Sequence, residues 1–234
     1  MKQINLHSLR NFKKTKISMK KVLLSAIAVL AIGTASAQSH QKGTMQVNVL
    51  GGFMTGSGTQ KGDEAGSTKY KFDAAGAQFG VNFQYGIAES FSAGIGLELG
   101  TAVLTPKNLN FEDYDYGYTD PSISTFKVNV SGRYYFVNKD KFNVFAGPSI
   151  GFTTGKDKDL AYSYAGAEKT KYSGLNYGVN AGGNYFFTDV VGVILNVGYE
   201  GNSLKSKLTE EGVDYKGKAT LGGVKVMAGL ALKF

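Results

Sequence analysis

The chain of 234 residues has no cysteine and no tryptophan, only three prolines and only two histidines. Without cysteine there is no disulfide framework, no thiolate nucleophile and no thiolate metal site. Both histidines, His7 and His40, precede the first predicted strand, so no histidine-based dyad or triad can be built in the body of the chain. We therefore expect that the protein is not an enzyme and that it holds no metal or cofactor.

Long apolar runs are also missing. The longest, residues 22–33, is too short to cross a bilayer as a helix, and it is flanked by the features of a secretory signal: Lys20-Lys21 before it and the small residues Ala35-Ser36-Ala37 after it. We predict a signal peptide over residues 1–37, a mature start at Gln38, a short polar lead over 38–43 and one barrel domain over 44–234. Met19 is an alternative true start.

The net charge of +8 belongs to this leader. Seven of the 26 lysines and arginines lie in residues 1–37, which hold no acidic residue, so the rest of the chain carries 19 basic against 18 acidic side chains. A nearly neutral mature chain gives no electrostatic reason for a nucleic-acid partner.

What the chain has in quantity is glycine (32), tyrosine (14) and phenylalanine (15), a composition that favours closely packed strands. The last twelve residues alternate strictly, with one wholly apolar face: Val224, Val226, Ala228, Leu230, Leu232 and Phe234. A period of two is the side-chain period of a β-strand. The chain therefore ends in an amphipathic strand whose last residue is aromatic.

The same alternation recurs along the chain and predicts eight strands: 44–55, 70–85, 91–104, 122–136, 142–154, 172–187, 191–201 and 218–234. Short turns and longer polar connections alternate between them, the longer ones being 56–69, 106–121, 155–171 and 202–217. We expect bulges at 74–76, where the apolar positions change parity, and at Pro148. The pattern predicts an all-β, eight-stranded, antiparallel, up-and-down barrel.

Alternation alone does not say which face points inward, since a soluble barrel would bury its apolar face. Small polar residues on the other face suit a narrow interior better than a solvated surface. Aromatic residues also gather beside the short turns, as in an interfacial girdle: Tyr85, Phe91, Phe136, Phe142, Phe186, Phe187 and Phe234. We therefore predict that the apolar face is outside and that the barrel is transmembrane.

On these features, residues 44–234 resemble the small OmpA/OmpX-like outer-membrane barrels of Gram-negative bacteria. The resemblance implies an integral barrel in the outer membrane, short periplasmic turns and long extracellular loops. It also implies that Phe234 acts as an assembly signal, read by the barrel-assembly machinery in the C-terminal strand. Nothing in the resemblance specifies a function.

Charged residues on the inward parity need partners in so narrow an interior. We expect a structural charge network there, formed by Glu98, Lys127, Arg133, Glu200 and Lys225. Counting from the short turns puts Glu200 at the height of Lys225, and Glu98 at the height of Lys127.

The most distinctive connection is acidic and aromatic. Its candidate interaction residues are Glu112, Asp113, Tyr114, Asp115, Tyr116, Tyr118 and Asp120. Acidic oxygens suit a divalent cation, tyrosines suit a protein partner, and a simply solvated loop has the same composition.

The sequence thus favours a barrel with a side-chain-filled interior and a structural or surface-interaction role through its long loops. The expected partners are membrane lipid, lipopolysaccharide, the assembly machinery and a surface protein or host ligand. The alternative function is a narrow channel or a small-ligand binding and transport barrel.

Overall fold

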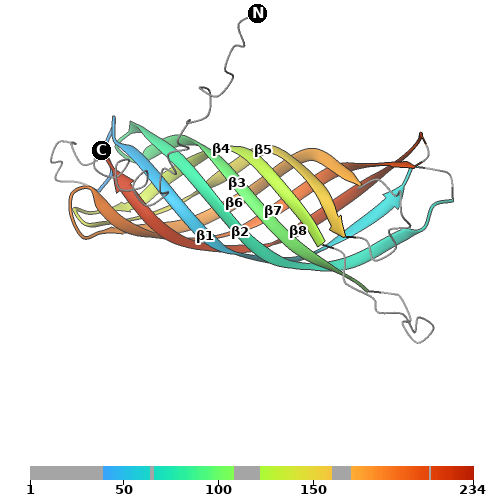
Figure 1. Cartoon of the computed structure of the whole chain (residues 1–234). Coiled ribbons are helices and arrows are strands. Elements are labelled where there is room, and N and C mark those ends of the chain that lie inside the picture. Colours follow the sequence, from blue (N-terminus) through green and yellow to red (C-terminus); the bar gives the residue numbers. More distant parts are fainter. Residues whose placement is uncertain (1–38, 64–65, 108–121, 160–169, 211) are drawn as a thin grey trace, which may run out of the picture. The chain divides into compact units, whose positions relative to one another are not determined.

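The computed structural model describes residues 39–63, 66–107, 122–159, 170–210 and 212–234 (Figure 1). Eight strands lie in them: β1 (Met45–Gly62), β2 (Lys69–Ala88), β3 (Phe91–Pro106), β4 (Ser122–Asn138), β5 (Phe142–Asp159), β6 (Lys171–Phe186), β7 (Val191–Glu210) and β8 (Val213–Lys233). No helix in this described part is long and apolar enough to cross a membrane.

The strands form one closed barrel in which each pairs antiparallel with its neighbours in sequence. β1 and β8 close the ring, as the blue and red ribbons in Figure 1 show, with an unbroken register from Gln46↔Lys233 to Gly62↔Gly217. At the end of this seam, Phe234 and Met45 donate their backbone N–H groups to each other's carbonyl oxygens at 2.7 and 2.9 Å. The predicted eight-stranded up-and-down barrel is confirmed.

Two ends of the barrel differ in their connections. At the short-turn end, strands are joined by residues 89–90, 139–141 and 187–190. At the opposite end, which we call the loop end, the connections are 63–68, 107–121, 160–170 and 211–212. The last of these is a tight hairpin, and Gly212, at φ 81°, adopts the left-handed backbone that such a reversal requires.

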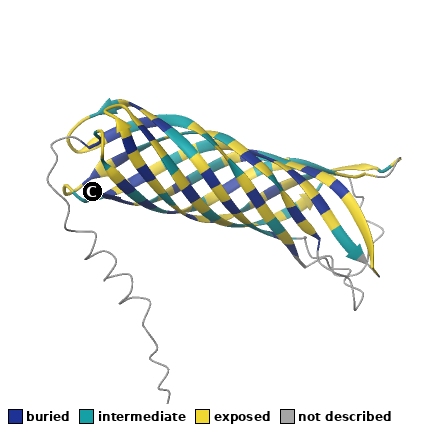
Figure 2. Cartoon of the chain, turned by 90° about the horizontal axis from the view of Figure 1, so that it is seen from above, coloured by how far each residue is buried: buried dark blue, intermediate teal, exposed yellow. Residues whose placement is uncertain are grey.

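Buried and exposed residues alternate along every strand, which produces the chequered pattern of Figure 2. Large apolar side chains lie outside; Leu99 and Val179, for example, are 58% and 62% exposed. The predicted outward apolar face is therefore confirmed. One expected girdle residue is wrong, because Phe186 is 1% exposed and packs inside with Phe145 and Ile194.

The strands at the loop end are longer than the sequence pattern predicted. The expected connection 202–217 is mostly β-structure, since β7 and β8 pair continuously from Asn202↔Leu221 to Glu210↔Val213. The expected connection 56–69 likewise continues β1 as far as Gly62. Both predictions were wrong because the outward residues here are lysine, serine and threonine, so the strands no longer show an apolar outer face.

Neither predicted bulge is where it was expected. β2 keeps one register with β1 and β3 through residues 74–76. The apolar residues therefore move from the inner face of the strand to its outer face at this point without a bulge. The register between β4 and β5 is the same on both sides of Pro148 and shifts instead between Tyr135 and Val137.

Candidate functional site

The inside of the barrel holds a linear chain of four charged side chains, one from each of β4, β7, β8 and β3. Lys127 contacts Glu200 Oε1, while Lys225 Nζ lies 2.9 Å from Glu200 Oε2 and 3.0 Å from both carboxylate oxygens of Glu98. Lys127 and Glu200 are only 3% and 5% exposed. Asn202 Nδ2 adds a hydrogen bond to Glu200 at 3.1 Å. Each charge of this chain thus has an opposite charge in contact, which offsets the cost of its desolvation.

The structure brings four of the five predicted interior charges together, in a pairing that differs in part from the expectation. Glu200 meets Lys225 as the count of residues predicted. Glu98 and Lys127 are register partners on β3 and β4, yet their side chains reach across the interior to Lys225 and Glu200 instead. The lysines therefore bridge strands that are not neighbours.

Arg133, the fifth predicted residue, lies apart from this chain, towards the short-turn end. Its guanidinium carbon is 4.2 Å from the centroid of the Phe145 ring, and its Nη2 donates to Asn82 Oδ1 at 3.1 Å. Arg133 Nη1 has no hydrogen-bond partner among the described protein atoms. Arg133 is therefore held by an aromatic ring and an amide, and it forms no ion pair with a carboxylate in the part of the chain that the structure describes.

A polar cavity of about 60 Å³ separates Arg133 from the charge chain, lined also by Asn129, Ser149 and Asn180. A polar cavity of this size suits a few water molecules, which would supply partners for Arg133 Nη1 and Asn129 Oδ1. It is too small for a metabolite. Within the described strands and turns, no group of three or more histidine or acidic side chains is arranged to hold a metal ion.

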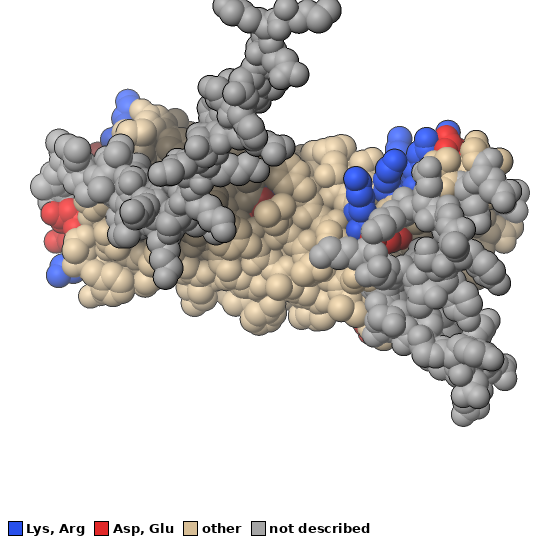
Figure 3. Space-filling view, in the orientation of Figure 1, with Lys and Arg blue, Asp and Glu red and all other residues tan. Residues whose placement is uncertain are grey.

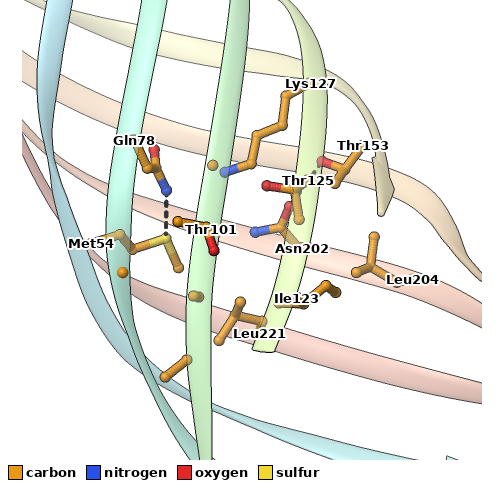
Figure 4. A pocket seen from close by; sticks show the side chains of 14 residues that line it. Met54, Gln78, Thr101, Ile123, Thr125, Lys127, Thr153, Asn202, Leu204 and Leu221 are labelled. Carbon is orange, nitrogen blue, oxygen red and sulfur yellow. Dashed lines mark hydrogen bonds between the residues drawn. The ribbon is translucent and has the colours of Figure 1, made fainter. Parts of the chain in front are cut away.

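Above the charge chain, towards the loop end, the inner face carries an apolar cluster, with the buried polar residues Asp157 and Ser206 beside it. Ile123, Tyr172, Leu204 and Ala219 pack into a buried cluster, which we call the upper cluster, and Ala102 and Leu104 lie against it. A cavity of about 40 Å³ lies between these walls; Figure 4 shows its lining, with Lys127 at one side and a hydrogen bond from Gln78 Nε2 to Met54 Sδ at 3.3 Å. This space also falls far short of a ligand pocket.

At the short-turn end, the polar lead closes the barrel. Ser39 and His40 are almost completely buried, and the His40 ring stacks on Tyr135 with 3.9 Å between centroids. Asn138 Oδ1 accepts hydrogen bonds from Ser39 Oγ and His40 N at 2.9 and 3.1 Å, and Asn138 Nδ2 donates to His40 O at 2.7 Å. The sequence predicted only a short polar lead over 38–43 and not this plug, because nothing local in a short polar segment indicates a long-range docking site.

Burial governs the protonation of His40. Desolvation lowers the pKa of its imidazole below the ordinary 6.5, with Arg133 and Lys233 adding repulsion, although hydrogen bonds between the ring and the backbone of Ala88 and Phe91 oppose the shift. The neutral ring is therefore the form that fits the plug. Its Nε2 lies 3.2 Å from the carbonyl oxygen of Ala88.

Other predicted features fall outside the described residues. These are the signal peptide 1–37 and the whole acidic and aromatic set in 106–121 from Glu112 to Asp120. Phe234 is described, and it sits at the seam of the barrel beside Met45.

Comparison with known families gives one match over most of the chain. The family described as "Outer membrane protein beta-barrel domain" matches residues 36–224. No protein in the curated set matches the chain.

Three solved structures of outer-membrane proteins are similar to this chain to different degrees. The outer membrane protein OprG from Pseudomonas aeruginosa aligns with a TM-score of 0.63 and 20% identity, over 83% of this chain and 97% of that one. Neisserial surface protein A aligns at 0.43 and 15%, over 86% and 100%. The outer membrane protease OmpT from Escherichia coli aligns at 0.48 and 9%, over 88% and 100%. At these identities, the likeness to OprG shows the fold, and the other two carry no further argument.

Proposed function

This chain belongs to the outer membrane β-barrel family, and we propose that it is a closed barrel with a structural or surface-interaction role at its loop end. Membrane lipid surrounds a barrel of this family. In bacterial outer-membrane barrels the short turns face the periplasm and the longer connections face outward. The loop end is therefore the part of this protein that would meet the cell's surroundings.

The observation that carries the proposal is the filling of the interior at three successive heights. The lead residues Ser39 and His40 occupy the short-turn end, the charge chain crosses the middle, and the upper cluster fills the region above it. Eight strands enclose an interior that side chains can fill. The cavities beside the charge chain and the upper cluster, about 60 and 40 Å³, are too small for a ligand site or an open pore, and the larger hollow of about 330 Å³ lies further towards the loop end.

Planar-bilayer recording tests this proposal against the alternative of a narrow channel. Protein purified from outer membranes should give no stable conductance steps, because the charge chain and the plug block the axis. As a positive control, a variant lacking residues 39–43 and carrying Lys127→Ala should conduct more often than the wild type. Reproducible steps from the homogeneous wild-type protein would instead favour transport.

A non-enzymatic role is part of the proposal. The only histidines are His7 and His40, and the His40 side chain is stacked on Tyr135 and bonded to a backbone carbonyl, which leaves it unsuited to proton transfer with a substrate. The interior carboxylates Glu98 and Glu200 are both paired with lysines. The buried carboxylate of Asp157 accepts a hydrogen bond from Tyr172 Oη at 3.4 Å. When the purified protein is incubated with peptide and lipid substrates, these substrates should remain intact.

We also propose export by the leader and assembly through the last residue. Cleavage after Ala37 would start the mature chain at Gln38, and mass spectrometry of the membrane protein would detect an intact leader if this is wrong.

Deletion of Phe234 removes backbone hydrogen bonds that close the seam with Met45 as well as the terminal aromatic ring. Phe234→Ala, which keeps the backbone, separates the two effects: lost outer-membrane levels in both variants support recognition of the ring by the assembly machinery.

A further inference from the structure

Besides Lys71 on β2, which faces Thr59 on β1, eight lysines surround the loop end on outward, exposed positions of six strands. They are Lys61, Lys69, Lys156, Lys171, Lys205, Lys207, Lys216 and Lys218, and we call this set the lysine collar. On the face seen in Figure 3, the middle of the barrel is largely tan, and blue side chains gather near the end away from the C-terminus.

The register places these lysines directly opposite one another. The opposed pairs are Lys61↔Lys69, Lys61↔Lys218, Lys205↔Lys218, Lys207↔Lys216, Lys171↔Lys207 and Lys156↔Lys171. Like charges at directly opposed positions destabilise a sheet, whereas opposite charges at the same positions stabilise it. The collar therefore concentrates repulsion that some anion would relieve.

Few anions of the protein itself do so. Among the described residues, collar lysines form two ion pairs: Lys207 with Asp214 at 2.8 Å and Lys218 with Asp63 at 3.9 Å. All four side chains are largely exposed, so these pairs contribute little.

A row of hydroxyl groups accompanies the collar. On five strands, the outward residue two positions nearer the middle of the barrel is serine or threonine: Thr59, Thr154, Ser173, Ser203 and Thr220. Thr59 and Thr220 hydroxyls lie 3.0 Å apart on β1 and β8. An ammonium group with a hydroxyl beside it is chemistry that binds phosphate oxygens, the lysine supplying charge and the hydroxyl a hydrogen bond.

The position along the barrel matches that of lipid headgroups. Below the hydroxyl row begins the apolar outer face, with Leu175, Tyr177 and Tyr199 each about half exposed. Tyr177 lies over Gly201, and Tyr199 over Gly222. Tyrosines in this position are typical of the boundary between hydrocarbon and headgroups. The collar thus stands about where phosphates of the outward-facing leaflet would be.

We propose that the lysine collar and its hydroxyl row bind the phosphorylated headgroups of outer-leaflet lipids. The opposed lysines share phosphate oxygens between neighbouring strands, which turns their repulsion into a binding site. This inference rests on the proposed orientation of the loop end and on its surface role, and it is independent of whether the barrel conducts.

Binding of micellar lipid A to the purified protein tests the proposal, with the same lipid after removal of both phosphates as the comparison. Lys205→Gln/Lys218→Gln removes one opposed pair and should weaken binding of the phosphorylated lipid roughly tenfold, because each basic residue near an anionic surface contributes substantially. Lys139→Gln/Lys141→Gln makes the same change of charge at the short-turn end and should change binding less than twofold. If the double variant does not fold, the single variant Lys61→Gln replaces it in the test. Because Lys61 belongs to two opposed pairs, this variant should weaken binding severalfold.

Three results would overturn the assignment: equal binding of the phosphorylated and dephosphorylated lipids, equal losses in the collar and control variants, or displacement of the lipid by equimolar inorganic phosphate. The last would point to a soluble phosphate ligand. Conductance of the wild type, by contrast, would argue against the closed barrel and leave this measurement untouched.

Discussion

The middle and the loop end of this barrel share one continuous wall of strands, but the apolar face is the outer one in the middle and the inner one at the loop end. In the middle, outward residues such as Leu97 and Val130 are apolar, and the interior holds the charge chain. At the loop end, the outward residues are lysines and hydroxyls, and the interior holds the upper cluster. β2 passes from one region to the other without a register shift.

The surroundings of each region therefore decide which face of the wall is apolar, while the strand pairing remains the same. Lipid accepts apolar side chains outside, so the polar and charged residues of the middle have to find partners inside. Water favours lysine and serine outside, so the loop end can hold a small apolar core as a soluble barrel does. The two regions should therefore respond to mutation in different ways.

The largest effect should come from the charge chain. Glu200→Gln leaves Lys127, which is 3% exposed, without a carboxylate and should cost on the order of 3–5 kcal/mol in unfolding free energy. Urea unfolding of the protein in lipid vesicles measures this cost.

The matched rescue is Glu200→Gln/Lys127→Met, which also removes the stranded charge. It should recover much of the loss, because a buried pair replaced as a whole costs far less than half a pair. Additive losses in the double variant would mean that the two side chains do not form a coupled buried pair.

The next effect separates the two faces at the loop end. Leu204→Ala opens space in the upper cluster and should cost about 2–5 kcal/mol, whereas the adjacent outward Lys205→Ala should cost almost nothing. The same urea titration compares them. A larger cost at Lys205 than at Leu204 would contradict the assignment of the inner face.

The exchange of the apolar face between the middle and the loop end explains which parts of the fold could be predicted from the sequence. In the middle, apolar residues on one parity and short turns defined the strands, and counting from the turns correctly placed Glu200 beside Lys225. At the loop end, Leu204, Ser206 and Leu208 alternate with Lys205 and Lys207, a strand pattern of opposite sign. Because the apolar residues here are on the inner face and not the outer one, the sequence pattern predicted a connection over this stretch.

The interior contacts were less predictable. Lys127 and Lys225 have side chains long enough to choose partners across the interior, so strand register alone did not determine that Lys127 meets Glu200. The stacking of His40 on Tyr135 joins residues far apart in sequence and left no local signal.

A smaller effect of opposite sign is expected in the lysine collar. In neutral detergent without phosphorylated lipid, Lys61→Thr relieves two like-charge contacts and should stabilise the barrel by about 0.2–1 kcal/mol. The gain should shrink in high salt, where screening has already weakened the repulsion. Thermal unfolding at two ionic strengths would detect this, and a loss of stability at low salt would argue against repulsion between these lysines.

The smallest effect should be confined to the plug at the short-turn end, where pH acts through His40. Burial lowers the pKa of the folded imidazole below the ordinary 6.5, so docking of the lead is favoured in full above pH 6.5. Its contribution is lost as pH falls through the lowered folded pKa, since the ring must then take up a proton against desolvation and the nearby Arg133 and Lys233. Amide hydrogen exchange should report it: the His40 N–H, bonded to Asn138 Oδ1, should exchange faster in acid relative to the intrinsic rate. His40→Gln should abolish that pH dependence, whereas amides of the upper cluster, such as that of Leu204, should show no such change in either protein.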